Sequence, residues 1–541
     1  MKKLMLLGDE ALAQGAIDAG CSGVFAYPGT PSTEIMEYVQ KNPDAKLRNL
    51  HRTWASNEKT AVESAVGMSY TGKRTMSCMK HVGLNVAADP FMNSAFVGAN
   101  GGNIVAVADD PSMHSSQNEQ DSRYYAKFAM IPCLEPSNQQ ECYDMAFHAY
   151  ELSEKFHLPV MVRLETRLSH SRSGVERREM LPENELNLPE DRNQFMLLPA
   201  FARAKYKKLI AIQPELAAAA ENSPYNWVDD GNEKSIGIIA CGLAYNYVKE
   251  VTEKYGCENP VLKISQYPLP VKMIKDFMNN CEKIIVVEEG QPLVEEMLKG
   301  AIPSGNKIMG RLDGTFSRDG EMNPNKVAIA LGKEEAKEET LPEVVVGRPP
   351  ALCVGCPHID SYKSLNEALK SYIDDGQRHV FSDIGCYTLG FMPPYNSINT
   401  CLDMGASITM AKGAADAGLF PAIAVIGDST FSHSGMTGLL DCIYDKSNLV
   451  IMILDNSTTG MTGGQDYTGY GKLEQICIGL GVEKEHIRII TPLSRHFEEN
   501  VKVLKEEIDY EGVSVVIPRR ECVQTMARRV RAQQKKKQEA K

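Results

Sequence analysis

The stretch 422–465 reads AIAVIGDSTFSHSGMTGLLDCIYDKSNLVIMILDNSTTGMTGGQ and contains two apolar runs that each stop at polar turn residues. The first run, 422–426, stops at Gly427-Asp428-Ser429. The second run, 449–454, stops at Asp455-Asn456. Apolar runs of this length predict buried parallel strands, and the segment between them suits a crossover helix. The stretch therefore predicts an open α/β sheet whose strands end at one common edge.

Asp428 and Asn456 follow the two predicted strands, so both should lie at the edge where open α/β sheets bind their ligands. A carboxylate and an amide oxygen suit a hard cation such as Mg²⁺, which also needs phosphate or water oxygens to complete its octahedron. The alternative is local, with Asp428 capping the helix and Asn456 forming a turn. We favour a metal–diphosphate site.

The composition describes a soluble globular protein with several domains. The chain has 541 residues, of which 43% are hydrophobic and 24% are charged, and its length suggests three or four units. The net charge of −12 disfavours nonspecific nucleic-acid binding. The apolar run at 4–8 is too short for a signal-peptide core or a membrane span, so we expect a cytoplasmic protein that binds neither nucleic acid nor membrane.

The spacing of Gly427-Asp428 and Asn456 resembles the diphosphate-binding motif of thiamine diphosphate enzymes. The resemblance implies a Mg²⁺ ion held by Asp428, Asn456 and the backbone carbonyl of Thr458. Ser429 stands where the family usually has glycine. The following TGMTGGQ, which contains Thr462, resembles more narrowly the 2-oxoacid:ferredoxin oxidoreductases, especially the indolepyruvate branch. The implied cofactor contacts in this part are Gly427, Asp428, Ser429, Asn456, Thr458 and Thr462.

The N-terminal part also has an α/β pattern, because apolar runs at 23–26, 104–108 and 160–164 alternate with helix-like segments at 57–70 and 140–155. The turn Tyr27-Pro28-Gly29-Thr30-Pro31-Ser32 follows the first run, and Ser32 or Thr33 could cap the next helix. A strand-to-helix turn rich in proline and glycine is common. This hexapeptide, however, resembles the family's substrate-side loop, which implies that Thr30 faces the thiamine and the oxoacid. The implied cofactor contacts here are Tyr27, Pro28, Gly29 and Thr30.

Glu58 begins the helix-like segment NEKTAVESAVGMSYTG, where the helix dipole also stabilises an acid. Glu63 is a rival carboxylate in the same segment. The distance from Glu58 to Lys80-His81-Val82-Gly83 resembles the family's pattern for its catalytic glutamate. The resemblance implies that the Glu58 carboxylate binds the aminopyrimidine ring of the cofactor and promotes loss of the thiazolium proton, which requires a buried acid.

The polar loop 109–123 also resembles the indolepyruvate branch. In related pyruvate enzymes, an arginine upstream of this loop binds the substrate carboxylate, but here that neighbourhood is Val105-Ala106-Val107. His114, Ser115, Ser116 or Arg123 could replace it, and the sequence does not choose among them.

Four cysteines form the second motif: Cys353 and Cys356 in one Cys-x-x-Cys, then Cys386, and Cys522 after an apolar run. A structural zinc site normally uses two close pairs, and a thioredoxin-like pair needs a fold context that is missing here. The third alternative is a [4Fe–4S] cluster, whose four thiolates need not be close in sequence. The pattern resembles the proximal cluster of the ferredoxin-linked 2-oxoacid enzymes. His358 is expected to be a loop or core histidine.

The resemblance extends from Tyr27 to Cys522 and implies an α/β protein of four regions. These are a pyrimidine-type thiamine-binding domain (1–200), a transketolase C-terminal-like domain (201–335), a diphosphate-type thiamine-binding domain with the cysteines (345–525) and a basic tail (526–541). The polar stretch 169–226 is expected to be a boundary or a draped connection. The charged stretch 331–340 is expected to be a linker, and the tail a frayed, solvated end.

The family's activity is oxidative decarboxylation of an aryl 2-oxoacid to the acyl-CoA, with electrons passing through the cluster to ferredoxin. The resemblance implies thiamine diphosphate, Mg²⁺ and a [4Fe–4S] cluster as cofactors, and coenzyme A as a substrate. It also implies a smaller γ-type subunit in a dimer of heterodimers. No ferredoxin-like module follows Cys522, so further clusters are expected on another polypeptide. The alternatives are a non-oxidative thiamine-dependent decarboxylase or synthase and a non-catalytic, zinc-stabilised subunit.

Overall fold

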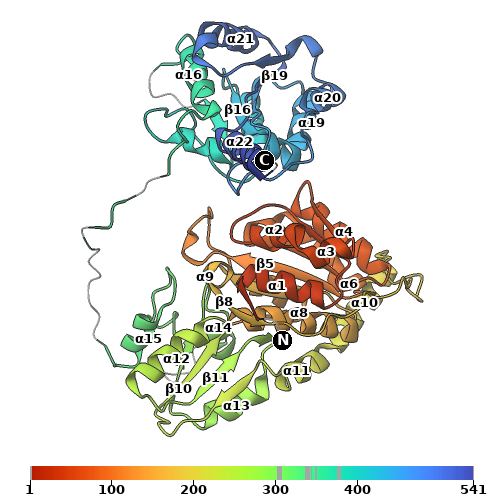
Figure 1. The fold of residues 1–541 in the computed structure, drawn as a ribbon, viewed down its shortest axis with the longest axis vertical. Helices are drawn as coiled ribbons and strands as arrows, with labels where there is room; N and C mark the ends of the chain where they lie inside the picture. Colours follow the sequence, from red (N-terminus) through yellow and green to blue (C-terminus); the bar gives the residue numbers. More distant parts are fainter. Residues whose placement is uncertain are drawn as a thin grey trace. The chain divides into compact units, whose positions relative to one another are not determined.

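The structure is a computed structural model that describes residues 3–300, 308–334, 342, 344–347, 350–374 and 379–539. The chain folds into two compact units, Met1–Thr340 and Leu341–Lys541 (Figure 1). The first unit therefore contains the predicted pyrimidine-type and transketolase C-terminal-like regions. The second contains the predicted diphosphate-type region and the tail.

A seven-stranded sheet forms the centre of the N-terminal half of the first unit. Its strand order is β12-β6-β7-β5-β4-β2-β3, and all neighbours are parallel except β12 and β6. The strands are β2 Gly23–Ala26, β3 His51–Trp54, β4 Thr75–Lys80, β5 Asn103–Asp109, β6 Cys133–Leu134, β7 Val160–Glu165 and β12 Gln266–Tyr267. Every residue of β4, β5 and β7 is buried, as expected for parallel strands that are covered on both faces. The three strands that the sequence predicts here are confirmed.

Two groups of helices pack on this sheet. In one group, α1 (Gly8–Asp18) contacts α8 (Gln139–Phe156) and α2 (Thr33–Lys41). In the other, α4 (Glu58–Tyr70) contacts α6 (Ala88–Val97). The predicted helices at 57–70 and 140–155 are therefore confirmed within one residue at each end.

A second, five-stranded sheet completes the first unit, with strand order β14-β13-β10-β11-β9. Its strands are β9 Trp227–Asp229, β10 Ile236–Cys241, β11 Val261–Ile264, β13 Lys283–Val287 and β14 Ile308–Met309. Helices α12 (Ala244–Tyr255) and α13 (Val271–Asn279) flank these strands (Figure 1). One continuous apolar core includes residues of both sheets, so the two halves of this unit pack together.

The stretch 169–226 is more ordered than its polarity suggests. It contains β8 (Arg172–Glu176), which pairs with β1 (Lys3–Leu7), and the helices α10 (Pro199–Ala211) and α11 (Gln213–Glu221). The expectation of a simple draped connection is wrong for these segments. The two helices bury few apolar side chains, Leu209 and Leu216 among them, and so their sequence has only a weak apolar pattern.

The second unit contains a parallel sheet of order β15-β16-β17-β19-β18. Its strands are β15 Val380–Ser382, β16 Ile423–Gly427, β17 Leu449–Leu454, β18 Ile487–Ile490 and β19 Val513–Pro518. Helix α19 (Met436–Asp445) connects β16 to its neighbour β17. The strand–helix–strand predicted from the stretch 422–465 is confirmed.

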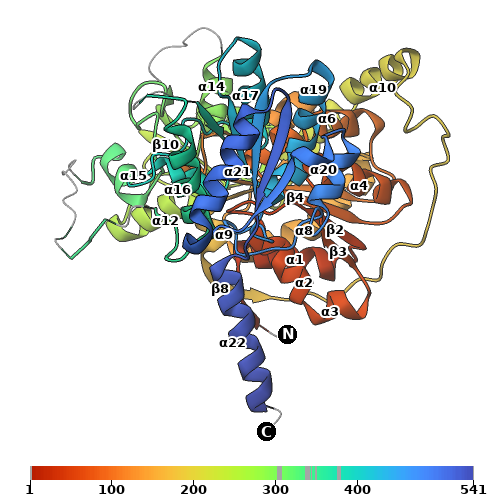
Figure 2. The ribbon, with the colours of Figure 1, turned by 90° about the horizontal axis from the view of Figure 1, so that it is seen from above.

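The basic C-terminal segment is helical, which corrects the prediction of a frayed end. Helix α22 spans Val523–Glu539 and projects from the second unit (Figure 2). Its Ala, Arg, Gln, Lys and Glu residues have high helix propensity, although few of them contribute to a core. Most of the predicted linker, 335–340, lies outside the described residues. Within the described part of the chain, every helix is too short or too polar to span a bilayer.

Candidate functional site

The carboxyl edge of the sheet in the second unit brings together two residues that the sequence singled out. Strand β16 pairs with β17 so that Gly427 lies opposite Leu454, and Asp428 and Asn456 follow these strand ends. Asp428 is 2% exposed. Its two carboxylate oxygens accept the backbone N–H groups of Ser429 and Ser457, each at 2.8 Å. The backbone of the second strand end therefore binds the carboxylate that follows the first.

The electrostatics of this edge favour a cation. Burial, and then the neighbouring charge of Asp455, raise the pKa of the Asp428 carboxyl well above its ordinary value. Asn456 and Thr458 are buried beside it, and the Asn456 side-chain oxygen accepts the Thr458 N–H at 3.1 Å. In the described residues, no three His, Cys, Asp or Glu side chains are placed to hold one metal ion. An ion here would use one carboxylate, an amide oxygen, a backbone carbonyl and ligand oxygens, a donor set that suits Mg²⁺.

The segment TGMTGGQ forms a closed loop beside Asn456. The Thr462 hydroxyl donates to the Gln465 side-chain oxygen at 2.6 Å, and the Thr458 hydroxyl donates to the Gln465 carbonyl at 3.1 Å. The Ser429 hydroxyl lies 2.9 Å from the hydroxyl of Thr459. Ser429, which stands where the family usually has glycine, thus links the first strand end to this loop.

His358 contacts Asn456 at this edge, a contact that the sequence did not predict. Its ring is buried, and its Nε2 atom lies 3.3 Å from the side-chain nitrogen of Asn456. Burial lowers the pKa of His358 to about 4, so the ring is neutral at pH 7 and can accept from the amide. His358 therefore is a core histidine, as expected, and it also orients Asn456. Its place directly after Cys356-Pro357 is the one signal in the sequence.

The four predicted cysteines gather at the same edge. The Cys522 N–H donates to the Asn456 carbonyl at 3.0 Å, and the Cys356 N–H donates to the Cys353 carbonyl at 3.0 Å. Burial, followed by the charges of the other three thiols, raises the pKa of Cys386 to about 12. The other three thiols therefore act electrostatically on Cys386, although within the described part of the chain no three of these thiols are placed to hold one metal ion. Gathered thiols that raise one another's pKa are stabilised as thiolates by bound iron or zinc.

In the first unit, the structure distinguishes the two candidate glutamates. Glu58 is the first residue of α4 and is 5% exposed. Its side chain lies against Gly83, where an added Cβ would come within 2.6 Å of the Glu58 Oε1 atom. Glu63 lies on the exposed face of the same helix and pairs with Lys59. Glu58 is therefore the buried carboxylate that the implied role requires, and Glu63 is not.

The turn that contains Thr30 follows β2 at the carboxyl edge of the seven-stranded sheet. The Gly29 N–H donates to the Thr33 hydroxyl at 3.0 Å, and the Ser32 hydroxyl donates back to the Gly29 carbonyl at 2.7 Å. The helix cap expected of Ser32 is not made. Tyr27, Pro28 and Gly29 are buried, whereas Thr30 is half-buried, with its carbonyl accepting from the Ser115 hydroxyl at 3.3 Å.

Arg123, one of the residues considered for binding the substrate carboxylate, is already fully paired within the protein. It is 1% exposed and pairs with Asp121, at 2.5 Å, and with Glu288, at 3.0 Å. Ser115 and Ser116 both bind the carboxylate of Asp110. His114 lies 3.1 Å from Glu321. Arg123 therefore stabilises the contact between the two sheets of the first unit and is not available to bind a substrate carboxylate.

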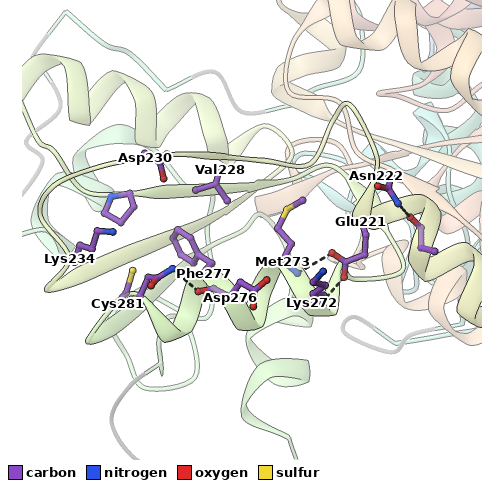
Figure 3. A pocket seen from close by; sticks show the side chains of 13 residues that line it. Glu221, Asn222, Val228, Asp230, Lys234, Lys272, Met273, Asp276, Phe277 and Cys281 are labelled. Atoms are coloured by element: carbon purple, nitrogen blue, oxygen red, sulfur yellow. Dashed lines mark hydrogen bonds between the residues drawn. The ribbon is translucent and has the colours of Figure 1, made fainter.

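A pocket of about 560 Å³ opens at the edge of the second sheet, between α11 and α13 (Figure 3). The Glu221 carboxylate accepts the backbone N–H groups of Lys272, at 2.6 Å, and Met273, at 3.0 Å, at the start of α13. Lys234, Asp230 and Asp276 add further charges to its wall. No residue that the sequence predicts as functional lines this pocket, so its size alone does not make it the catalytic centre.

Comparisons with known proteins agree with this geometry. Residues 14–215 match the family model "Pyruvate flavodoxin/ferredoxin oxidoreductase, thiamine diP-bdg". Residues 383–517 match "Thiamine pyrophosphate enzyme, C-terminal TPP binding domain". The indolepyruvate oxidoreductase subunit IorA of Archaeoglobus fulgidus is 41% identical over 96% of this chain and 86% of the relative. The chain belongs to the IorA family.

Two further comparisons are consistent with this family. IorA of Methanothermobacter thermautotrophicus is 37% identical over 96% of this chain and 87% of its own length. A solved structure of the 2-oxoglutarate:ferredoxin oxidoreductase from Magnetococcus marinus is similar with a TM-score of 0.50. At 18% identity, covering 61% of this chain and 65% of that one, it supports the fold alone. The IorA-family chain described here therefore has an α/β, thiamine diphosphate-binding fold.

Proposed function

We propose that this chain catalyses the oxidative decarboxylation of an aryl 2-oxoacid, such as indolepyruvate, to the acyl-CoA. Electrons leave through a [4Fe–4S] cluster to ferredoxin. Membership of the IorA family supports the 2-oxoacid and the oxidoreductase chemistry. The observation that carries the redox part is the contact between the two motifs of the second unit. The N–H of Cys522 binds the carbonyl of Asn456.

Asp428, Asn456 and the Thr458 carbonyl would hold Mg²⁺ and, through it, the diphosphate. Bound thiamine diphosphate supplies a carbon nucleophile and an electron sink for loss of CO₂. The backbone amides of Ser429 and Ser457 hold the Asp428 carboxylate in place, and His358 orients the Asn456 amide. The chain's part at this edge is therefore to bind and orient the cofactor.

Glu58 would hold a proton at the aminopyrimidine ring of the cofactor. The carboxylate is buried at the start of α4 and packs against Gly83, so its position is restricted. A carboxylate in such a place can share a proton with a ring nitrogen without competition from water. Tyr27, Pro28, Gly29 and Thr30 would line the same end of the cofactor.

Cys353, Cys356, Cys386 and Cys522 would hold the cluster, which supplies a one-electron acceptor when bound. Their number and type would suit four thiolate ligands, and the charges of the other three thiols that act on Cys386 support this assignment. A zinc ion is the competing occupant of four thiolates. Iron analysis distinguishes the two.

The proposal extends to the domains and partners. The regions 1–200, 201–335 and 345–525 would be the pyrimidine-type, transketolase C-terminal-like and diphosphate-type domains. The name of the relatives as subunits supports a partner subunit, which we propose is smaller and assembles with this chain as a dimer of heterodimers. Coenzyme A, ferredoxin and a cytoplasmic location complete the proposal.

The test is an anaerobic assay of the purified chain with a panel of 2-oxoacids and a viologen dye, together with iron and thiamine analysis. We expect dye reduction that is fastest with aryl 2-oxoacids, requires thiamine diphosphate and accompanies about four irons per chain. Thiamine-dependent CO₂ release from a protein without iron would instead establish a non-oxidative decarboxylase.

Asp428→Ala tests the cofactor site separately. Thiamine diphosphate plus Mg²⁺ should raise the Tm of the wild-type chain and leave that of Asp428→Ala unchanged, because a ligand stabilises only a protein that binds it. Asp445→Ala removes an exposed carboxylate of the same unit and should keep the full shift. An absent shift in the wild type would favour a non-catalytic subunit.

A further inference from the structure

Lys80 is a buried cation at the edge that carries Thr30 and Glu58. It is the last residue of β4 and is 9% exposed. Strand β4 lies between β2 and β5, so Lys80 is close to the turn after β2 and the loop after β5. The methylene chain of Lys80 lies against Gly29, where an added Cβ would come within 3.1 Å of it. Its position is therefore set by the predicted substrate-side turn.

The ammonium group of Lys80 has little compensation within the protein. Its Nζ atom donates to the Ser115 carbonyl at 3.3 Å, and it forms no ion pair with any described residue. The charges of Asp110 and then of Glu58 raise the pKa of Lys80, but neither carboxylate forms an ion pair with it. The Asp110 carboxylate already accepts from Thr166 at 2.7 Å, from Ser116 at 2.7 Å and from the Ser115 N–H at 2.8 Å.

Among the residues that the structure describes, the other buried lysine is Lys263, and its charge is compensated by a carboxylate. Lys263 is 0% exposed, pairs with Glu141 and donates to the Ser137 hydroxyl at 3.0 Å. Among the described residues, the buried arginines also pair with carboxylates: Arg123, Arg163 and Arg311. A buried charge is costly unless it is paired. Lys80 differs from these buried residues because it forms no ion pair with a described carboxylate, so an anion from outside the chain would stabilise it.

We infer that Lys80 binds the carboxylate of the 2-oxoacid substrate. The inference rests on the proposed function and specifies how that site recognises its substrate class. The carboxyl edge of an open α/β sheet is where a ligand arrives, and Lys80 there lies against the turn of Thr30. Lys80 thus takes the carboxylate-binding role for which Arg123 is not available.

The protonation of Lys80 is consistent with a ligand-binding role. Burial lowers its pKa to about 8, against the opposing charges of Asp110 and Glu58. The adjacent His81 is buried, and burial lowers its pKa too, so it contributes no positive charge at pH 7. Lys80 is therefore charged at pH 7 and loses its proton as the pH rises through 8.

The test compares two ligands that the enzyme cannot decarboxylate, phenyllactate and phenyllactamide, which differ in the carboxylate alone. Binding is measured by calorimetry on the full chain loaded with thiamine diphosphate and Mg²⁺, so turnover is not needed. We expect the wild type to prefer the acid by about 30-fold or more, the lower bound for a buried, hydrogen-bonded charge pair. Lys80→Gln should lose this preference, and Lys80→Arg should keep most of it.

Lys263→Gln is the matched control, because it also removes a buried ammonium. It should lower the Tm but leave the acid preference intact. An unchanged preference in folded Lys80→Gln would overturn the inference and make Lys80 a support for the loop of Ser115. A wild type without any preference for the acid would overturn it as well.

Two further measurements cover the cases in which Lys80→Gln does not fold or the proposed function fails. If Lys80→Gln does not fold, the wild-type preference is followed with pH instead. A fall above pH 8 supports the role of Lys80, whereas a preference that persists to pH 10 refutes it. Failure of the proposed function would be seen separately, as absence of 2-oxoacid-dependent dye reduction in a wild-type protein that still prefers the acid.

Discussion

The two units each place polar side chains at the carboxyl edge of a sheet, but they hold them differently. In the second unit, backbone N–H groups bind the side chain: those of Ser429, the next residue, and of Ser457, at the end of the neighbouring strand, bind Asp428. In the first unit, Glu58 packs against Gly83 and Lys80 against Gly29. In the first unit, close packing against glycine therefore restricts the charged side chains.

This difference affects which substitutions each edge can accept without loss of function. A backbone N–H group keeps its hydrogen bond when the side chain of its own residue is changed, so such a change leaves Asp428 in place. Close packing against glycine is more sensitive to substitution, because an added methyl group must displace the charged side chain. Substitution of a residue that supports a charged side chain should therefore disturb function more strongly at the edge of the first unit.

The largest effect is expected for Glu58→Gln. The amide has the shape of the acid but cannot hold the proton, so turnover should fall by about 10²–10⁴-fold, the usual contribution of a general acid–base group. Thiamine diphosphate should still raise the Tm. Glu63→Gln, on the exposed face of α4, is the control and should be close to normal. Near-normal turnover in Glu58→Gln would refute its role.

A smaller loss is expected for Gly83→Ala, which keeps every chemical group of the site. Its Cβ would come within 2.6 Å of the Glu58 Oε1 atom and must shift the carboxylate. Misplacement of this size can cost about 10²-fold in turnover.

Gly67→Ala is the matched control in the same helix as Glu58, since nothing lies within 4 Å of its Cβ position. It should raise the free energy of unfolding by about 0.5–1 kcal/mol and leave turnover unchanged. Equal turnover in the two alanine variants would show that the packing of Gly83 does not position Glu58.

The smallest effect is expected at the edge of the second unit. Ser429→Gly removes one hydroxyl contact, to Thr459, and should lower the free energy of unfolding by about 0.5–1.5 kcal/mol. Affinity for thiamine diphosphate should not change, because the backbone N–H of residue 429 still binds Asp428. Urea unfolding and a cofactor titration measure the two quantities. A large loss of affinity would remove the difference between the edges.

Much of the fold could be predicted from local patterns. The apolar runs predict strands β2, β5, β7, β16 and β17, because burial on both faces of a parallel strand requires continuous apolar residues. Asp428 and Asn456 could be predicted as neighbours because they follow two strands joined by one crossover. Polarity misled the prediction where helices have few buried residues, as in α10, α11 and α22.

The sequence by itself determined the α/β class, the motif around Asp428, the four cysteines and the position of Glu58 at the start of a helix. Only the tertiary structure decided which charges are compensated. Arg123 forms ion pairs with Asp121 and Glu288, whereas Lys80 forms no ion pair with a described residue, and neither outcome can be read from the sequence around each residue. Hydrophobic patterns and motif spacing are local, whereas compensation of a buried charge depends on segments far apart in the chain.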